Sequence, residues 1–200
     1  MTKKTKVWTS EAWANSLYIK WISFESSPHE VAMAQRCRRG EFIDPSWFPY
    51  RVFQDHKNAT LNHVSLIQSG LVLVSERFGE LLRSFEFGNN QLVETELYDP
   101  TRSIKREGRF FILNVTEKKA GCLVYEESAG PFSGKANTGY LTSGVGYDGI
   151  AVREMNSIGG VDLWMDPILK MTPFFSGPLG DAIKKGKFGR TGLKPCVVLS

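Results

Sequence analysis

The sequence predicts an α+β fold: a mixed sheet that carries two strand–capped helix–strand units, several additional strands and one N-terminal helix. Three observations predict it. Two short apolar stretches, 101 positions apart, repeat one pattern of residues. A run near residue 30 has the start and stop signals of a helix. Nineteen glycines and 12% aromatic residues favour strands and turns over a helical bundle.

We expect the N-terminal part to contain one strand and one helix. The strand is placed within Leu17–Phe24, and the helix within SSPHEVAMAQRCRRG. In that run Ser27 is the expected cap, Pro28 suits the first helical position, and Glu30 completes a capping box. Three arginines in the last turn and Gly40 after it favour a helix end.

The next two segments are less regular in pattern. Asp44–Phe53 is aromatic and holds two prolines, so we expect irregular structure or an edge strand. Ala59–Gln68 is expected to form a short helix, with Leu61, Val64 and Ile67 facing inward.

The first copy of the repeat begins with an apolar, β-branched strand at Leu71–Val74. Ser75 is the expected cap of a helix that ends by Gly88, and Leu92–Tyr98 alternates as a half-buried strand does. The apolar residues of this helix recur at helical spacing on one face: Phe78, Leu81, Leu82 and Phe85.

The second copy has the same order, with the apolar residues after Pro173 followed by Ser176 as the expected cap. Two lysines and Gly186 favour the helix end, and GLKPCVVL is a closing strand. The matched pairs at constant offset are Ser75/Ser176, Phe78/Leu179, Gly79/Gly180, Leu82/Ile183 and Phe87/Phe188. A unit of this kind cannot bury its helix stripe alone, so each copy predicts a sheet beneath it.

Between the copies we expect further strands at Arg109–Val115, Gly121–Tyr125, Gly149–Val152 and Val161–Trp164. Glu126–Gly149 is rich in small residues and is expected to be the least ordered or most extended part of the surface. The chain is predicted to form one domain over residues 1–200. A possible seam near Asn58 would separate an N-terminal lobe, 1–57, from a lobe at 58–200.

The charge pattern limits the classes of partner that we expect. The net charge is +4, and residues 76–130, with eight basic and ten acidic side chains, lie between two basic thirds. No dense basic stripe is present, so nucleic-acid binding is not favoured. No apolar run is long enough to span a membrane, and the N-terminus lacks the pattern of a signal peptide. Three widely separated cysteines fit a reducing cytosol.

Chemical motifs are sparse. His29, His56 and His63 are the only histidines, and their spacing with no nearby cysteine predicts no metal site. The paired carboxylates Glu94 and Glu96 lack a visible third partner for acid–base catalysis and are expected on the solvent face. We therefore expect no catalytic residue, metal or cofactor.

The stretch VDLWMDPILKMTPFFSGPLGDAIKKGKFGRTGLKPCVV, together with LVLVSERFGELLRSFEF and RFFILNV before it, resembles polymorphic-toxin immunity family eleven of bacteria. The resemblance covers about Ser65–Val198 and is carried by spacing and apolar pattern. It implies a cytoplasmic protein that binds and neutralises a cognate secreted toxin, encoded nearby and used in competition between bacteria. It implies neither a cofactor nor a reaction.

An inhibitor of this kind concentrates its binding energy in a few aromatic or arginine anchors. The expected toxin contacts are Trp47, Phe48 and Tyr50 as exposed aromatics, and Tyr140, Tyr147, Asp148 and Arg153 in or beside the long loop. Two alternatives stay open at this point: a small hydrolase or transferase with an unrecognised site, and a weakly basic protein associated with nucleic acid.

Overall fold

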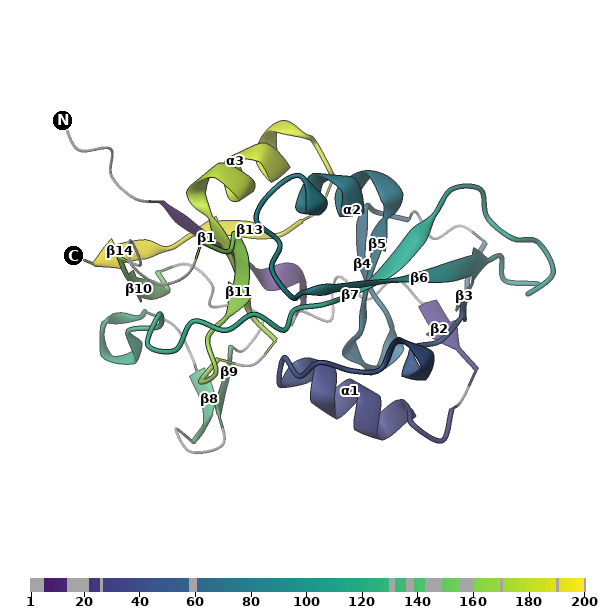
Figure 1. The fold of residues 1–200 in the computed structure, drawn as a ribbon, viewed down its shortest axis with the longest axis horizontal. Coiled ribbons are helices and arrows are strands. Elements are labelled where there is room, and N and C mark those ends of the chain that lie inside the picture. Colours follow the sequence, from purple (N-terminus) through teal and green to yellow (C-terminus); the bar gives the residue numbers. More distant parts are fainter. Residues whose placement is uncertain are drawn as a thin grey trace.

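A computed structural model describes residues 6–13, 22–25, 27–57, 61–129, 132–135, 139–142, 149–154, 160–169, 171–189 and 191–199. Within these ranges the fold is α+β, with three α-helices and two main sheets (Figure 1). The first helix, α1, lies on the opposite side of the fold from α2 and α3.

The larger sheet has six strands in the order β2-β3-β6-β7-β5-β4. It is mixed, because β3 and β6 run parallel and the other neighbours run antiparallel. The strands are β2 (Ile22–Phe24), β3 (Arg51–Gln54), β4 (Val64–Leu66), β5 (Val72–Ser75), β6 (Gln91–Tyr98) and β7 (Phe110–Asn114).

The second sheet has four antiparallel strands in the order β11-β12-β1-β13. They are β1 (Val7–Ser10), β11 (Leu163–Met165), β12 (Pro173–Ser176) and β13 (Leu193–Pro195). Two strand pairs lie outside these sheets. The strands β10 (Ala151–Arg153) and β14 (Val197–Leu199) pair in parallel, and β8 (Phe132–Lys135) and β9 (Gly139–Thr142) form a hairpin.

The two copies of the repeat fold alike, each on its own sheet. In the first, β5 and β6 are both antiparallel to β7 between them, and α2 (Glu76–Arg83) connects them. In the second, β12 and β13 flank β1 in the same way, and α3 (Gly177–Lys185) connects them. The outer strands β4 and β11 also correspond, so β4-β5-β7-β6 repeats as β11-β12-β1-β13.

The correspondence extends to the register of the strands. Val74 pairs with Phe111 as Phe175 pairs with Trp8, and Glu94 pairs with Phe111 as Pro195 pairs with Trp8. The offset of 101 therefore holds from β5 to β6. The expectation of one sheet beneath both units is corrected: the central strand of the second unit comes from the N-terminus, which gives that unit a sheet of its own.

One core joins the two repeats. Its buried members come from both helices and from the sheet faces below them, including Phe78, Leu82, Leu179 and Ile183. The opposite face of the six-stranded sheet packs on α1 (Glu30–Arg38) through a second cluster that contains Met33. The opposite face of the four-stranded sheet forms a third cluster with the segments around β10.

The caps of the repeat are confirmed. The Ser75 Oγ accepts a hydrogen bond from the Phe78 N–H at 3.4 Å, and the Ser176 Oγ accepts one from the Leu179 N–H at 3.3 Å. The helix α2 ends before Gly88, at Arg83.

The start of α1 differs from the expectation. It begins at Glu30, and its N-cap residue His29 makes no side-chain capping bond. Ser27 instead turns the chain just before the helix, because its Oγ accepts from the His29 N–H and its carbonyl oxygen accepts from the Glu30 N–H. The capping box with Glu30 was therefore wrong.

Three predictions of secondary structure are corrected. The helix expected at Ala59–Gln68 is wrong, because β4 lies within it, paired with β5. Asp44–Phe53 was expected to be irregular or an edge strand. The part before Arg51 is irregular apart from the short 3₁₀ turn Pro45–Trp47, but β3 is not an edge strand, because it lies between β2 and β6. The strand expected at Gly121–Tyr125 is reduced to one bridge, Leu123 to Val152. Long-range pairing decides each case, and no local pattern contains it.

Candidate partner-binding surface

The candidate surface begins where α1 ends. The Gly40 N–H donates to the Cys37 carbonyl oxygen at 2.9 Å, and the Glu41 N–H donates to the Arg36 carbonyl oxygen at 3.1 Å. These two bonds form a Schellman motif, which requires a left-handed residue at Gly40, where φ is 61°. A Cβ at Gly40 would also lie 2.6 Å from the Met165 Cε. Glycine therefore fixes the direction in which the chain leaves the helix.

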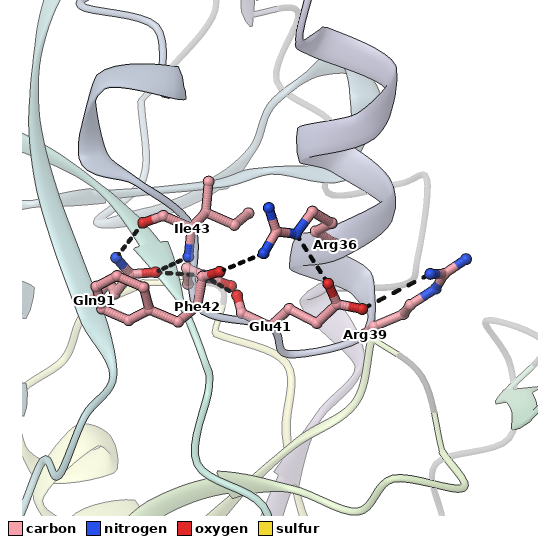
Figure 2. A network of polar contacts seen from close by, with 7 residues as sticks. Arg36, Arg39, Glu41, Phe42, Ile43 and Gln91 are labelled. Carbon is pink, nitrogen blue, oxygen red and sulfur yellow. Dashed lines mark hydrogen bonds and ion pairs between the residues drawn. The ribbon is translucent and has the colours of Figure 1, made fainter.

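The segment that follows displays Phe42 to solvent. The Phe42 side chain is 61% exposed, whereas its neighbour Ile43 is fully buried. The buried Gln91 amide holds both backbone groups of Ile43: its Oε1 accepts from the N–H at 3.1 Å, and its Nε2 donates to the carbonyl oxygen at 2.7 Å (Figure 2). The Asn114 Nδ2 donates to the Glu41 carbonyl oxygen at 2.9 Å. Two buried amides thus fix the backbone on both sides of an exposed aromatic ring.

Charged side chains complete this arrangement. The Arg36 Nη2 donates to the Phe42 carbonyl oxygen at 3.0 Å, and the Arg36 Nε lies 2.9 Å from the Glu41 carboxylate (Figure 2). The Arg39 Nη1 lies 3.7 Å from the same carboxylate. Exposed ion pairs of this kind contribute little stability. Their consequence here is positional: the Arg36 side chain bridges Glu41 and the Phe42 backbone, which helps to hold the segment in place.

Two hollows border the segment, one beside Asn89 and Glu117 and the other beside Arg39 and Lys118. We name one group of residues the Phe42 surface: the exposed Arg39, Phe42, Asn89 and Lys118 with the half-buried Glu41 and Glu117. The Asn90 side chain holds one wall, because its Oδ1 accepts from the backbone N–H groups of Thr116 and Glu117 at 2.8 and 3.0 Å.

A second exposed aromatic, Tyr50, lies at the start of β3 and is 66% exposed. Its hydroxyl donates to the Glu96 Oε1 at 3.0 Å. The Lys105 Nζ donates to the same oxygen at 2.7 Å, and the Tyr98 hydroxyl donates to the Glu96 Oε2 at 2.8 Å. The bonds from Lys105 first, and then from the two tyrosines, lower the pKa of Glu96 to about 2. Glu96 is therefore ionised at neutral pH and anchors the tyrosine ring by its hydroxyl.

The backbone at Tyr50 is also fixed. The Glu96 N–H donates to the Tyr50 carbonyl oxygen at 2.8 Å, and the Thr95 Oγ1 donates to the Pro49 carbonyl oxygen at 2.8 Å. Segment 41–50 therefore runs alongside β6 and is held to it at both ends.

The sequence matches the family model described as "Immunity protein family (Imm11)" over residues 23–198 of the 200-residue chain. The chain belongs to the Imm11 immunity protein family. No curated protein gives a significant sequence match. Membership assigns the chain a toxin-neutralising immunity function.

The aromatic residues expected as exposed contacts of this Imm11 protein have three different environments. Tyr50 is exposed as expected. Trp47 is half-buried, and its ring stacks on His29 with centroids 4.5 Å apart. Phe48 is 5% exposed and packs in the core with Met33, so its expected exposure was wrong. Phe48 turns inward because the chain leaves a short 3₁₀ turn, Pro45–Trp47, in extended conformation.

The contacts expected in and beside the long loop of the Imm11 chain are only partly described. Tyr140 lies in β9, and Tyr147 and Asp148 fall outside the described residues. Arg153 is exposed at the end of β10, and its N–H donates to the Cys122 carbonyl oxygen at 2.9 Å. The structure does not bring Arg153 together with Tyr50.

Sequence reasoning missed Phe42. Its signal is weak but present: an aromatic residue stands two positions after the glycine that closes α1, where polar residues usually face solvent. The two buried amides that hold it are 48 or more residues away in the sequence of the Imm11 chain, so no local pattern marks the site.

Reactive groups of this immunity protein are used in packing. The Ser75 Oγ lies 2.7 Å from the His63 Nδ1, but it also caps α2 and so faces a backbone N–H. Burial raises the pKa of the Cys37 thiol to about 12 and that of Cys122 to about 11, which disfavours the reactive thiolates.

The described part of the chain lacks two features. No group of three or more His, Cys, Asp or Glu side chains in it has the geometry to hold a metal ion. No helix in it is both long and apolar enough to cross a membrane.

Proposed function

We propose that this Imm11 chain neutralises its toxin by direct contact, as a stoichiometric inhibitor in the cytoplasm of the producing cell. The toxin would be the product of a neighbouring gene and would act in competition between bacteria. Family membership supports the immunity function, and the chemistry of the described surface supports direct contact.

The observation that carries this proposal is Tyr50. It is a large, mostly exposed ring whose hydroxyl is already fixed by Glu96. A tyrosine held in one position loses little further conformational entropy when a partner covers it. Hot spots of protein interfaces are enriched in such residues. A pre-ordered tyrosine is therefore suited to anchor a partner.

The remaining expected contacts are proposed in supporting roles. The segment that contains Tyr140, Tyr147 and Asp148 would determine which toxin is recognised, and Arg153 would contribute charge beside it. Trp47, stacked on His29, would border the Tyr50 contact. Phe48 would act indirectly, because its ring is part of the core on which segment 41–50 lies.

The test is binding and protection with the toxin encoded beside this chain. Tyr50→Ala should weaken binding to the purified toxin at least about tenfold, or about 1.4 kcal/mol. It should also reduce survival of cells that express both proteins. Val31→Ala is a matched control, because Val31 is equally exposed on α1. Unchanged affinity in a folded Tyr50→Ala variant would contradict the role of Tyr50.

A further inference from the structure

We propose that the Phe42 surface is a second anchor for the toxin, and that it takes a face of the toxin that combines an apolar pocket with acidic side chains. This inference rests on the proposed function, because it assumes that a toxin binds. The added contact lies beyond the C-terminal end of α1, whereas His29 lies at its N-terminal end. The inference also specifies the chemistry of the partner that would cover Phe42.

Exposure of the Phe42 ring has a cost. Burial of a phenylalanine side chain is favourable, and an isolated chain forgoes that gain when the ring stays in water. Phe42 is 61% exposed although its neighbour Ile43 is fully buried. A polar side chain at this position would keep the same backbone bonds, because Gln91 and Asn114 bind only backbone groups of the segment. The ring itself is therefore not needed for those bonds.

The segment that carries Phe42 is rigid. The Schellman motif at Gly40, the two amides and the Arg36 guanidinium fix the segment at consecutive residues. Because the backbone is already ordered, a partner that covers Phe42 gains the burial of the ring without ordering a loop. Hot-spot residues have this combination of a large apolar side chain and a fixed position.

The charges near Phe42 bear on the partner. Arg39 and Lys118 belong to the Phe42 surface, and two more basic side chains border it: Arg38 lines the same hollow, and Arg36 binds the Phe42 carbonyl oxygen. The acidic side chains there are Glu41, Glu117 and, two residues after Phe42, the exposed Asp44. Arg36 and Arg39 already share Glu41. Asp166 borders one hollow but is 2% exposed, and its carboxylate accepts backbone bonds at Leu123 and Ile168. With the bordering residues included, four basic side chains stand against three acidic ones, so a partner face that carries acidic side chains is complementary to this excess.

The experiment measures toxin affinity and its salt dependence with two variants. Phe42→Ala should weaken binding at least about tenfold. Lys118→Glu should slow association and reduce the loss of affinity between about 50 and 300 mM salt, because it removes an attraction that salt screens. Lys57→Glu makes the same charge change at another exposed position and should have a smaller effect. Thermal unfolding of each variant establishes that it is folded.

The outcomes are separable. If Phe42→Ala and Lys118→Glu both bind the toxin with the affinity of the wild type, this inference is overturned and the proposed function is left intact. Absence of any toxin binding by the wild-type chain would overturn both. Sedimentation of the chain alone tests another occupant: a dimer that Phe42→Ala dissociates would show that a second copy covers Phe42, and would also overturn the inference.

Discussion

Gly180 of α3 lies directly against the indole ring of Trp8, the central aromatic of the four-stranded sheet. Its counterpart Gly79 of α2 lies against Phe111, which holds the same place in the six-stranded sheet. A basic residue of each helix lies over the same ring as the glycine. The Lys184 Nζ is 4.6 Å from the Trp8 ring centroid, and the Arg83 Cζ is 4.7 Å from that of Phe111. The repeat therefore conserves a contact between helix and sheet as well as the order of the strands.

The two glycines differ in how much room they leave, which gives a matched pair of substitutions. A Cβ on Gly180 would overlap the Trp8 ring, whereas a Cβ on Gly79 would lie 3.3 Å from the nearest Phe111 atom. We expect Gly180→Ala to destabilise the fold by about 1–3 kcal/mol through overpacking. Gly79→Ala should be near neutral, because a gain of about 0.5–1 kcal/mol in helix propensity offsets the tighter contact. Urea unfolding of both variants measures this, and equal losses would contradict the packing argument.

The two caps predict a second pair of variants. Ser75→Ala and Ser176→Ala should each lower stability by about 1 kcal/mol, because each leaves an N–H of the first helical turn without its side-chain acceptor. Ser84→Ala is the control, because Ser84 follows the end of α2 and its hydroxyl donates to the Leu81 carbonyl oxygen, so its removal frees no N–H of the first turn. Chemical denaturation compares the three. A cap variant as stable as the wild type would show that the serine contributes nothing to the helix start.

The parts of the fold that the sequence predicted are those that depend on local contacts. The unit from β5 to β6 was found because Ser75, the helix stripe and the alternation of Leu92–Tyr98 are all local signals. The place of β1 was not found, because its partners Phe175 and Lys194 lie more than 160 residues away.

The surface was predicted less completely, for the same reason. Tyr50 was identified by residue type alone, since aromatic residues between prolines are often displayed. Phe48 has the same residue signature and turns inward, and only packing against the core separates the two. Phe42 was missed because its exposure depends on the Gly40 turn and on the distant amides of Gln91 and Asn114.

His63 predicts a dependence of stability on pH. Burial first, and then the charge of Arg77, lower the pKa of His63 below its usual 6.5. The neutral ring is also the form that accepts from the Ser75 hydroxyl. The folded state therefore resists protonation, so this contribution is present above about pH 6.5 and is lost as the pH falls toward the lowered pKa.

The test compares wild type with His63→Asn, whose carbonyl oxygen still accepts from the Ser75 hydroxyl. The drop in unfolding free energy between about pH 7.5 and pH 5.5 should be smaller in the variant, because one of the groups that bind a proton on unfolding is gone. Carboxylates titrate in both proteins and cancel in the difference. Identical drops would show that His63 has the same pKa in both states.

We also expect the chain to unfold as one domain. The strands β1 and β3 come from residues 1–57, yet they pair with strands of residues 58–200 in both sheets. One core contains residues of both repeats. Tryptophan fluorescence and far-ultraviolet circular dichroism should therefore report a single, coincident urea transition. A chain that starts at residue 58 should not reach the native fold, and an early separate transition would support an independent lobe at 1–57.

The last prediction concerns the segment Glu126–Gly149, which we propose as the determinant of toxin choice. It contains the hairpin of β8 and β9, whose strands pair with each other and with no other described strand. Figure 1 shows the hairpin as an extension from the body of the fold. An element with few ties to the core can change in sequence without loss of the scaffold. Tyrosine among small residues also makes an adaptable contact surface.

Tyr140→Ala or Tyr147→Ala should therefore weaken toxin binding by at least about 1 kcal/mol, or about fivefold, with little change in melting temperature. Tyr125→Ala is the control, because Tyr125 lies in the 3₁₀ turn just before the hairpin. Melting temperature and affinity measured on the same samples separate two physical roles. A ring that packs on the scaffold lowers the melting temperature when it is removed, and binding of the folded fraction is retained. A ring that contacts the toxin lowers affinity and leaves the melting temperature in place. If both tyrosines give the first result, the hairpin is scaffold, and recognition lies with Tyr50 and Phe42.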